Sequence, residues 1–215
     1  MNLIHLLKRV GLGVAVVAGL MLSACTSVDY YKGTGHFNTV VLDPGHGGHD
    51  QGARSVAGHP EKVHALDIAM RAADILRANG YHVIMTRTSD VFIPLPQRAA
   101  ISNRTHDSVF VSVHLNWTNR RGAEGLETYY FAPNSHKLAA NIQVEVMKVY
   151  RAKNRGVKTA RFHVLRKNKR PAVLVELGFL SNPEDAHLME KASHRQKLAN
   201  ALANGIMAED KGRIP

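Results

Sequence analysis

Two nearly continuous apolar segments constrain the fold of this chain more than any other feature. They lie at residues 109–113 and 172–175 and are interrupted only by Ser112. A strand that is buried on both faces shows such a run, whereas a strand with one solvent-exposed face alternates apolar and polar residues. Both segments are therefore predicted to be central strands of a sheet that is covered on both sides.

Strands and helices alternate along the rest of the chain. Pro60 and Glu61 suit the first turn of a helix, because proline fits there and a carboxylate favours the positive end of the helix dipole. Gly80 is predicted to end this helix. Other strands are expected at 40–42, 81–85 and 126–131, and other helices at 96–103, 137–150, 183–190 and 194–208. The prediction is a single α/β domain, in which helices flank both faces of a largely parallel central sheet.

The N-terminal segment has the pattern of an export signal. Lys8 and Arg9 precede an apolar run at 10–22, and Ser23, Ala24 and Cys25 follow it. A basic start, a short apolar run and small residues at the exit are typical of a signal peptide. The last residues resemble a bacterial lipobox, in which the cysteine is lipidated. We expect a lipoprotein signal peptide at 1–24, a lipid on Cys25, a tether at 25–38 and the domain at 39–215. The alternative is an uncleaved anchor with an incidental cysteine.

The chain is strongly basic, with a formal net charge of +11. Loss of Lys8 and Arg9 with the signal peptide lowers this charge to +9, so anionic partners are expected. Ten Lys or Arg residues and no Asp or Glu lie between residues 146 and 175. This stretch is interpreted either as a solvated face or as a surface that attracts carboxylates or anionic lipid head groups. Export and the lack of interleaved aromatic residues argue against nucleic acid.

Polar side chains occur where the predicted strands end. His46 follows the first strand, His114 follows the run at 109–113, and Glu176 interrupts the run that begins at 172. In open α/β sheets, ligands bind beyond the carboxyl ends of the strands. A catalytic zinc takes about three His, Asp or Glu ligands and leaves a position for water. His46, Glu61 and His114 are candidate ligands, and Glu176 is a candidate base.

Spacing alone leaves other ligand sets open. Glu61 and His64 form an i, i+3 pair that would share one helix face, and His49 and His59 lie nearby. Glu61 by itself is equally typical of an ordinary helix-end charge.

Five motifs in order extend across the predicted domain. They are Val41 to Gly48 (VLDPGHGG), Glu61-Lys62, Thr86 to Asp90 (TRTSD) with Gln97-Arg98, Val111 to Asn116 (VSVHLN) and Val175 to Asn182 (VELGFLSN). Together they resemble the zinc-dependent N-acetylmuramoyl-L-alanine amidases of the amidase 3 family, over about residues 40–207.

This resemblance implies a set of functional residues. His46, Glu61 and His114 would hold zinc, Glu176 would be catalytic, and His49, His59 and His64 fall where the family shows no ligand. The implied reaction is hydrolysis of the amide between N-acetylmuramic acid and the L-alanine of the stem peptide. Glu127 matches a recurrent family glutamate and is expected either to line the site or to form a salt bridge at the edge of a strand.

The expected partners are peptidoglycan and, through the lipid on Cys25, a membrane. Thr26 rather than Asp after the cysteine favours the periplasmic face of the outer membrane. Because Pro133 to Phe162 has room for little beyond one helix, we expect an active site that needs no obligatory activator. The protein is also expected to be a monomer. The alternatives are another secreted zinc peptidase or amidase, or a non-catalytic wall-binding lipoprotein.

Overall fold

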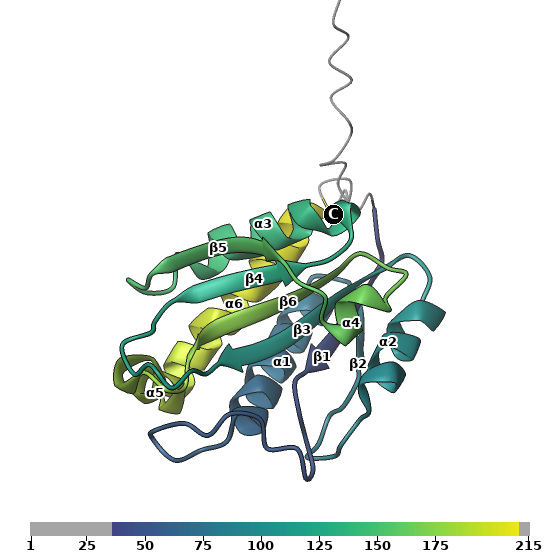
Figure 1. Ribbon diagram of the computed structural model, residues 1–215. Coiled ribbons are helices and arrows are strands. Elements are labelled where there is room, and N and C mark those ends of the chain that lie inside the picture. The colour runs from purple at the N-terminus through teal and green to yellow at the C-terminus, as the bar shows by residue number, and fades with distance from the viewer. Residues whose placement is uncertain (1–35, 211–215) are drawn as a thin grey trace, which may run out of the picture.

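The computed structural model describes residues 36–210, which form a six-stranded sheet with helices on both faces (Figure 1). The expected signal peptide, Cys25 and the tether up to residue 35 lie outside the described residues. The strand order is β2-β1-β3-β6-β4-β5, and every neighbouring pair is parallel except β4 with β6. The strands are β1 (Thr39–Pro44), β2 (His82–Met85), β3 (Ser108–Asn116), β4 (Leu126–Tyr130), β5 (Asn154–Thr159) and β6 (Ala172–Phe179).

The helices cover the two faces of the sheet unequally. Three helices pack behind it in Figure 1: α1 (Glu61–Ala78), α3 (His136–Val146) and α6 (Ala192–Glu209). In front lie α2 (Leu95–Arg104) and the short α4 (His163–Arg166). The 3-10 turn η1 (Pro133–Ser135) precedes α3, and α5 (Pro183–Glu190) follows β6. The front face is therefore the less completely covered.

The alternation of side chains along the strands explains the two faces. Successive residues of a strand point to opposite sides of the sheet. Val111, Val113 and Val175 point back into the main apolar core, whereas Phe110 and Leu174 belong to a smaller front cluster with Val164 and Leu165 of α4. Further along the front face, towards the carboxyl ends of the strands, Ser112, His114 and Glu176 follow at the same alternating positions.

The predicted fold class is confirmed, and β3 and β6 are central strands as expected. Strand β5 and helix α4 were not predicted. Within residues 36–210, strand β5 pairs with β4 alone and lies at the edge of the sheet. Its sequence NRGVKT therefore carries the polar residues of a half-exposed strand rather than an apolar run. The prediction of a single helix between Pro133 and Phe162 was therefore incomplete, because β5 also lies in this segment.

Phe37, in the segment predicted to be a tether, packs against the domain. Phe37 is buried, and its ring lies 5.8 Å from the ring of Tyr81. Residues 36–38 thus pack onto the domain. Among the described residues, no helix combines the length and the apolar character needed to cross a membrane.

A candidate metal centre at the carboxyl ends of the strands

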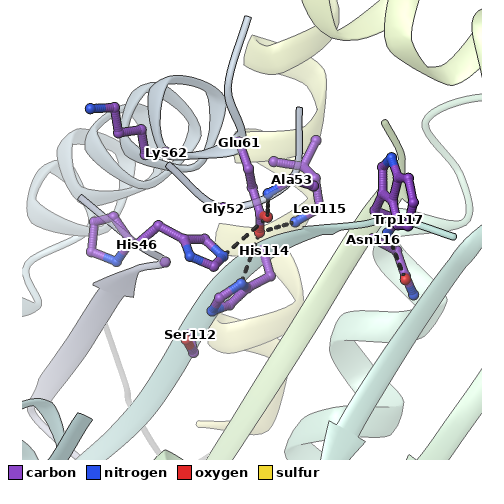
Figure 2. Close-up of polar contacts among 12 residues, drawn as sticks. His46, Gly52, Ala53, Glu61, Lys62, Ser112, His114, Leu115, Asn116 and Trp117 are labelled. Carbon is purple, nitrogen blue, oxygen red and sulfur yellow. Dashed lines mark hydrogen bonds and ion pairs between the residues drawn. The ribbon is translucent and has the colours of Figure 1, made fainter. Parts of the chain in front are cut away.

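His46, Glu61 and His114 lie together although they are far apart in the sequence. His46 Nε2 is 3.0 Å from Glu61 Oε2, and His114 Nδ1 is 2.9 Å from Glu61 Oε1. Figure 2 shows both imidazoles turned towards the carboxylate, which reaches them from the first turn of α1. One donor atom from each residue lies within 4.8 Å of the others, a grouping that could hold a metal ion.

The carboxylate of Glu61 is fixed from two further sides. The backbone N–H of Ala53 donates to Oε2 at 2.9 Å, and the backbone N–H of Leu115 donates to Oε1 at 3.0 Å. Burial would raise the pKa of Glu61, but its bonds to His114 and His46 outweigh burial and hold the pKa far below its usual range. Glu61 is therefore an anion in a fixed orientation, which is the state that binds a cation.

The two imidazoles respond to this anion. Burial would lower the pKa of His114, but the hydrogen bond and the charge of Glu61 raise it to about 9. The pKa of His46 is raised for the same reason, against burial. The negative charge of Glu61 thus stabilises a positive charge on each ring. When both rings are neutral, a bound metal ion can supply this positive charge instead.

Glu176 lies beside this cluster on the neighbouring strand. It is in register with His114 across β3 and β6, so the two side chains leave the same face of the sheet. Its Oε2 atom is buried and has no hydrogen-bond partner among the described residues. Burial raises the pKa of Glu176 to about 7; His114 opposes this shift, and the charges of Glu61 and Glu127 add to it. A carboxyl group of this kind can accept and release a proton near neutral pH.

The loop that carries His46 has a strained and closely packed backbone. His46 has φ +60°, a conformation that non-glycine residues rarely adopt. A Cβ atom on Gly45 would lie 2.4 Å from the ring of His114. A Cβ on Gly52, whose φ is +66°, would lie 2.6 Å from the ring of His46 and 2.7 Å from Glu61 Oε2. Such strain persists only where the surroundings hold the backbone in place.

Buried charged residues hold this loop. Arg98 donates to Asp43 Oδ1 at 2.8 Å and to the carbonyl of His46 at 2.6 Å. Arg87 donates to the carbonyl of Gly45 at 2.7 Å. Asp43 also accepts from the hydroxyls of Thr86 and Ser112. These motif residues hold the backbone on both sides of His46, and Asp43 and Arg98 also line the cavity beside the cluster.

The sequence prediction gave Asp43, Arg87 and Arg98 no role. A charged residue at the end of an apolar strand, as in Val40-Val41-Leu42-Asp43, is the signal that could have indicated a buried ion pair. The spacing in the sequence does not show which cation would pair with it.

Lys62 and Asp90 hold the same loop at Gly48. Lys62 donates to the carbonyl of Gly48 at 2.8 Å and to Asp90 Oδ2 at 2.7 Å. Asp90 Oδ1 in turn accepts from the backbone N–H of Gly48 at 2.8 Å. Lys62 follows Glu61 directly, so these two neighbouring residues join the start of α1 to the loop at Gly48 and at His46.

Glu127 of β4 forms the salt bridges that were one of its two expected roles. It is in register with Glu176 across β4 and β6, and it is almost fully buried. Its carboxylate accepts from Asn116 at 2.6 Å and pairs with Arg155 and Lys158 of β5. Glu127 therefore forms salt bridges to the edge strand and also lies in the row of side chains that leads to His114.

The competing histidines lie elsewhere. The ring of His49 lies against that of Phe92, with the centroids 4.2 Å apart and the planes tilted by 41°. His59 and His64 contact Glu190 rather than Glu61. The pairing of Glu61 with His64 that the helical spacing allowed does not form.

A cavity of ≈ 580 Å³ contains His46, Glu61, His114 and Glu176. Exposed aromatic residues, among them Trp117 and Phe162, lie along its wall. A second cavity of ≈ 740 Å³ adjoins it at Asn116 and is lined by polar and basic residues that include Arg120, Lys153 and Arg155. The site thus consists of two adjoining cavities, of which one holds the His-Glu-His cluster and the other is lined by basic residues.

Comparison with known proteins agrees with this arrangement. Residues 40–208 match the Amidase_3 family, described as N-acetylmuramoyl-L-alanine amidase. The structure of AmiC2 from Nostoc punctiforme is similar, with a TM-score of 0.76 and 38% identity over 82% of this chain and 97% of that one. The catalytic domain of the amidase CwlV from Bacillus (Paenibacillus) polymyxa gives a TM-score of 0.77 and 32% identity, over 80% and 97%.

Some relatives are longer proteins. The amidase LytC of Bacillus subtilis is 37% identical over 174 residues, which are 79% of this chain but 35% of LytC. The chain belongs to the Amidase_3 family of N-acetylmuramoyl-L-alanine amidases, which are peptidoglycan hydrolases. Its domain corresponds to their catalytic domain and contains a His-Glu-His group that can hold a metal.

Proposed function

We propose that this domain hydrolyses the amide bond between N-acetylmuramic acid and the L-alanine of the stem peptide, with Zn²⁺ bound by His46, Glu61 and His114. The observation that carries this proposal is the convergence of the three donors and the buried Glu176 in one cavity. Family membership supports the choice of substrate.

The donor set fits zinc. Two imidazoles and one carboxylate are ligands that Zn²⁺ accepts in hydrolases, at about 2.0–2.2 Å each, which separates neighbouring donors by about 3.4 Å in a tetrahedral site. The donor atoms here lie within 4.8 Å of one another, so small side-chain movements suffice. Asp50 Oδ1 lies 2.9 Å from His46 Nδ1 and fixes that ring with Nε2 towards Glu61, as outer carboxylates do for metal-bound histidines.

Bound zinc supplies Lewis acidity, which polarises a carbonyl and makes a water molecule more acidic near pH 7. Glu176 accepts the proton from the attacking water and then passes it to the nitrogen of the leaving L-alanine. In the metal-free domain burial raises the pKa of Glu176 to about 7, and the charge of a bound cation would lower it, which favours the ionised form that accepts the proton.

The surface around the centre suits a long, anionic substrate. Trp117 and Phe162 offer exposed aromatic faces beside the cluster. Arg120, Lys153 and Arg155 line the adjoining cavity. We place the glycan and L-alanine near the aromatic wall and the carboxylates of the stem peptide over the basic cavity. Among the described residues, no segment covers the cavity that contains His46, Glu61 and His114. This supports the proposal that the enzyme needs no activator.

Replacement of Glu176 by Gln tests the role of this residue. The full chain carrying Glu176→Gln should fold and bind Zn²⁺ with a stoichiometry like that of wild type, yet lose about 10²- to 10⁴-fold in turnover of purified sacculi. Glu145→Gln, a change on the outer side of α3, is the matched control and should retain activity. Wild-type turnover by Glu176→Gln would exclude Glu176 as the proton acceptor.

The attachment of the protein is a separate proposal. We infer that Cys25 carries the lipid and that the domain faces the periplasm from the outer membrane. Relatives such as the probable cell wall amidase LytH of Staphylococcus aureus support export to the cell envelope. Cells grown with a radiolabelled fatty acid should label the wild-type protein but not Cys25→Ser. Absence of label on the wild-type protein, or equal label on the variant, would contradict lipidation of Cys25.

A further inference from the structure

His59, His64 and Glu190 form a second cluster, separate from the centre described above. His59 lies in the loop before α1, His64 is on α1, and Glu190 is the last residue of α5. His59 Nδ1 is 2.7 Å from Glu190 Oε2, and His64 Nε2 is 3.3 Å from Glu190 Oε1. Residues from three segments of the chain therefore meet at one carboxylate.

Two buried atoms of this cluster lack a hydrogen bond. His64 is only 2% exposed. Its Nε2 atom and the facing Glu190 Oε1 are both buried, and neither makes a hydrogen bond to any described residue although they lie 3.3 Å apart. Leaving a polar atom buried without a partner costs about 1–3 kcal/mol, so such atoms are rare unless something else satisfies them.

The geometry parallels that of the first centre. In both clusters one carboxylate oxygen faces each histidine, and the donor atoms lie within 4.8 Å of one another. The two rings are nearly perpendicular in both cases: His59 and His64 at 75° and 5.9 Å, His46 and His114 at 79° and 4.9 Å. The clusters share helix α1 but no ligand.

We propose that His59, His64 and Glu190 form a second binding site for a divalent transition metal, of which Zn²⁺ is the best match. Two nitrogens and one carboxylate suit zinc better than Mg²⁺ or Ca²⁺, which prefer oxygen ligands. A cation between His64 Nε2 and Glu190 Oε1 satisfies both unpartnered atoms. The nearby cation Arg195 pairs with Asp67, which partly offsets its charge.

The site is expected to be structural. Asp67, the carboxylate three residues after His64 on α1, pairs with Arg71 and Arg195, so it does not take the place that Glu176 has beside the first cluster. Bound metal would tie the loop before α1 and the end of α5 to the start of α1. Because the side chain of His59 is 60% exposed, the ion can enter from solvent and keep water as a further ligand.

Metal binding by the untagged full chain tests the proposal. The protein is stripped with a chelator and titrated with Zn²⁺ by isothermal titration calorimetry, with the bound metal measured after dialysis. Wild type should bind two equivalents. His59→Gln and Glu190→Gln should bind one, because loss of a ligand should weaken the second site by about 100-fold or more, beyond the 10- to 100-fold typical of outer-shell changes.

Two control variants show which site binds each equivalent of Zn²⁺. His187→Gln changes an exposed histidine on the same helix α5 and should still bind two. His114→Ala should lose the other equivalent while keeping the one that depends on His59. Excess Zn²⁺ should also raise the Tm of His114→Ala, but not that of His114→Ala combined with His59→Gln.

Equal stoichiometry in wild type and His59→Gln would overturn the second site. A single equivalent in wild type that His114→Ala abolishes would also overturn it, while leaving the proposed catalytic centre intact. Because His59 lies outside the catalytic cluster, His59→Gln should retain turnover of sacculi within about twofold. Loss of turnover there would contradict the separation of the two sites.

Discussion

Replacement of Arg98 by Met should destabilise the protein and loosen the metal centre together. Arg98 and Asp43 form an ion pair whose side chains are 3% and 1% exposed. The change leaves the Asp43 carboxylate buried with only the hydroxyls of Thr86 and Ser112 as direct partners. Removing one partner of a buried pair costs about 3–5 kcal/mol, because the remaining charge is uncompensated.

Equilibrium unfolding in urea measures this loss in the full chain, stripped of metal so that ligand binding does not contribute. The double variant Asp43→Asn with Arg98→Met removes both charges. It should be more stable than the sum of the two single changes predicts, by about 1–3 kcal/mol of coupling. Zn²⁺ affinity should fall about 10- to 100-fold in Arg98→Met, because Arg98 holds the carbonyl of His46. A loss below 1 kcal/mol with strictly additive single changes would refute this account of the loop.

Two further predictions concern the backbone of the site and the acid stability of the domain. Gly52→Ala should reduce Zn²⁺ affinity by at least about 10-fold, because the added Cβ would collide with the ring of His46. Gly58 also has a positive φ (+112°), but a Cβ there would meet no atom within 4 Å, so Gly58→Ala should leave the affinity unchanged. Zinc titration of both variants decides between collision and backbone strain. Burial, with the charges of nearby lysines and an arginine, lowers the pKa of His194 to about 4. The unfolded chain therefore binds a proton between about pH 6.5 and 4 that the folded chain does not, so stability falls by up to about 3 kcal/mol over this range. His194→Phe, which keeps an aromatic ring against Tyr150, should reduce this loss in urea unfolding followed against pH; an unchanged pH dependence would contradict it.

The elements that bury continuous or periodic apolar faces were predictable from the sequence. The runs at 109–113 and 172–175 correspond to β3 and β6, and the helix predicted to open at Glu61 corresponds to α1. Strand β5 was missed because an edge strand buries only part of its surface, so its pattern is that of a polar loop. Helix α4 has four residues, which is too short to show a helical period.

The site was predictable only in part. Positions at strand ends indicated His46, His114 and Glu176, which the structure brings into one cavity. Spacing did not separate Glu61 from its competitors, because the direction of a side chain depends on the packing of distant segments. His59 and His64 contact Glu190, which lies at the end of α5 and far along the chain. The family motifs favoured the ligand set whose members the structure brings together.

The central claim concerns which bond this domain breaks. Purified sacculi are digested with the full chain in the presence of Zn²⁺, and the soluble products are identified by mass spectrometry, with Glu176→Gln as the inactive control. The account predicts free stem peptides that begin with L-alanine, together with glycan strands that have lost their peptides. Products cut within the stem peptide, or muropeptides in which the peptide is still joined to N-acetylmuramic acid, would contradict it.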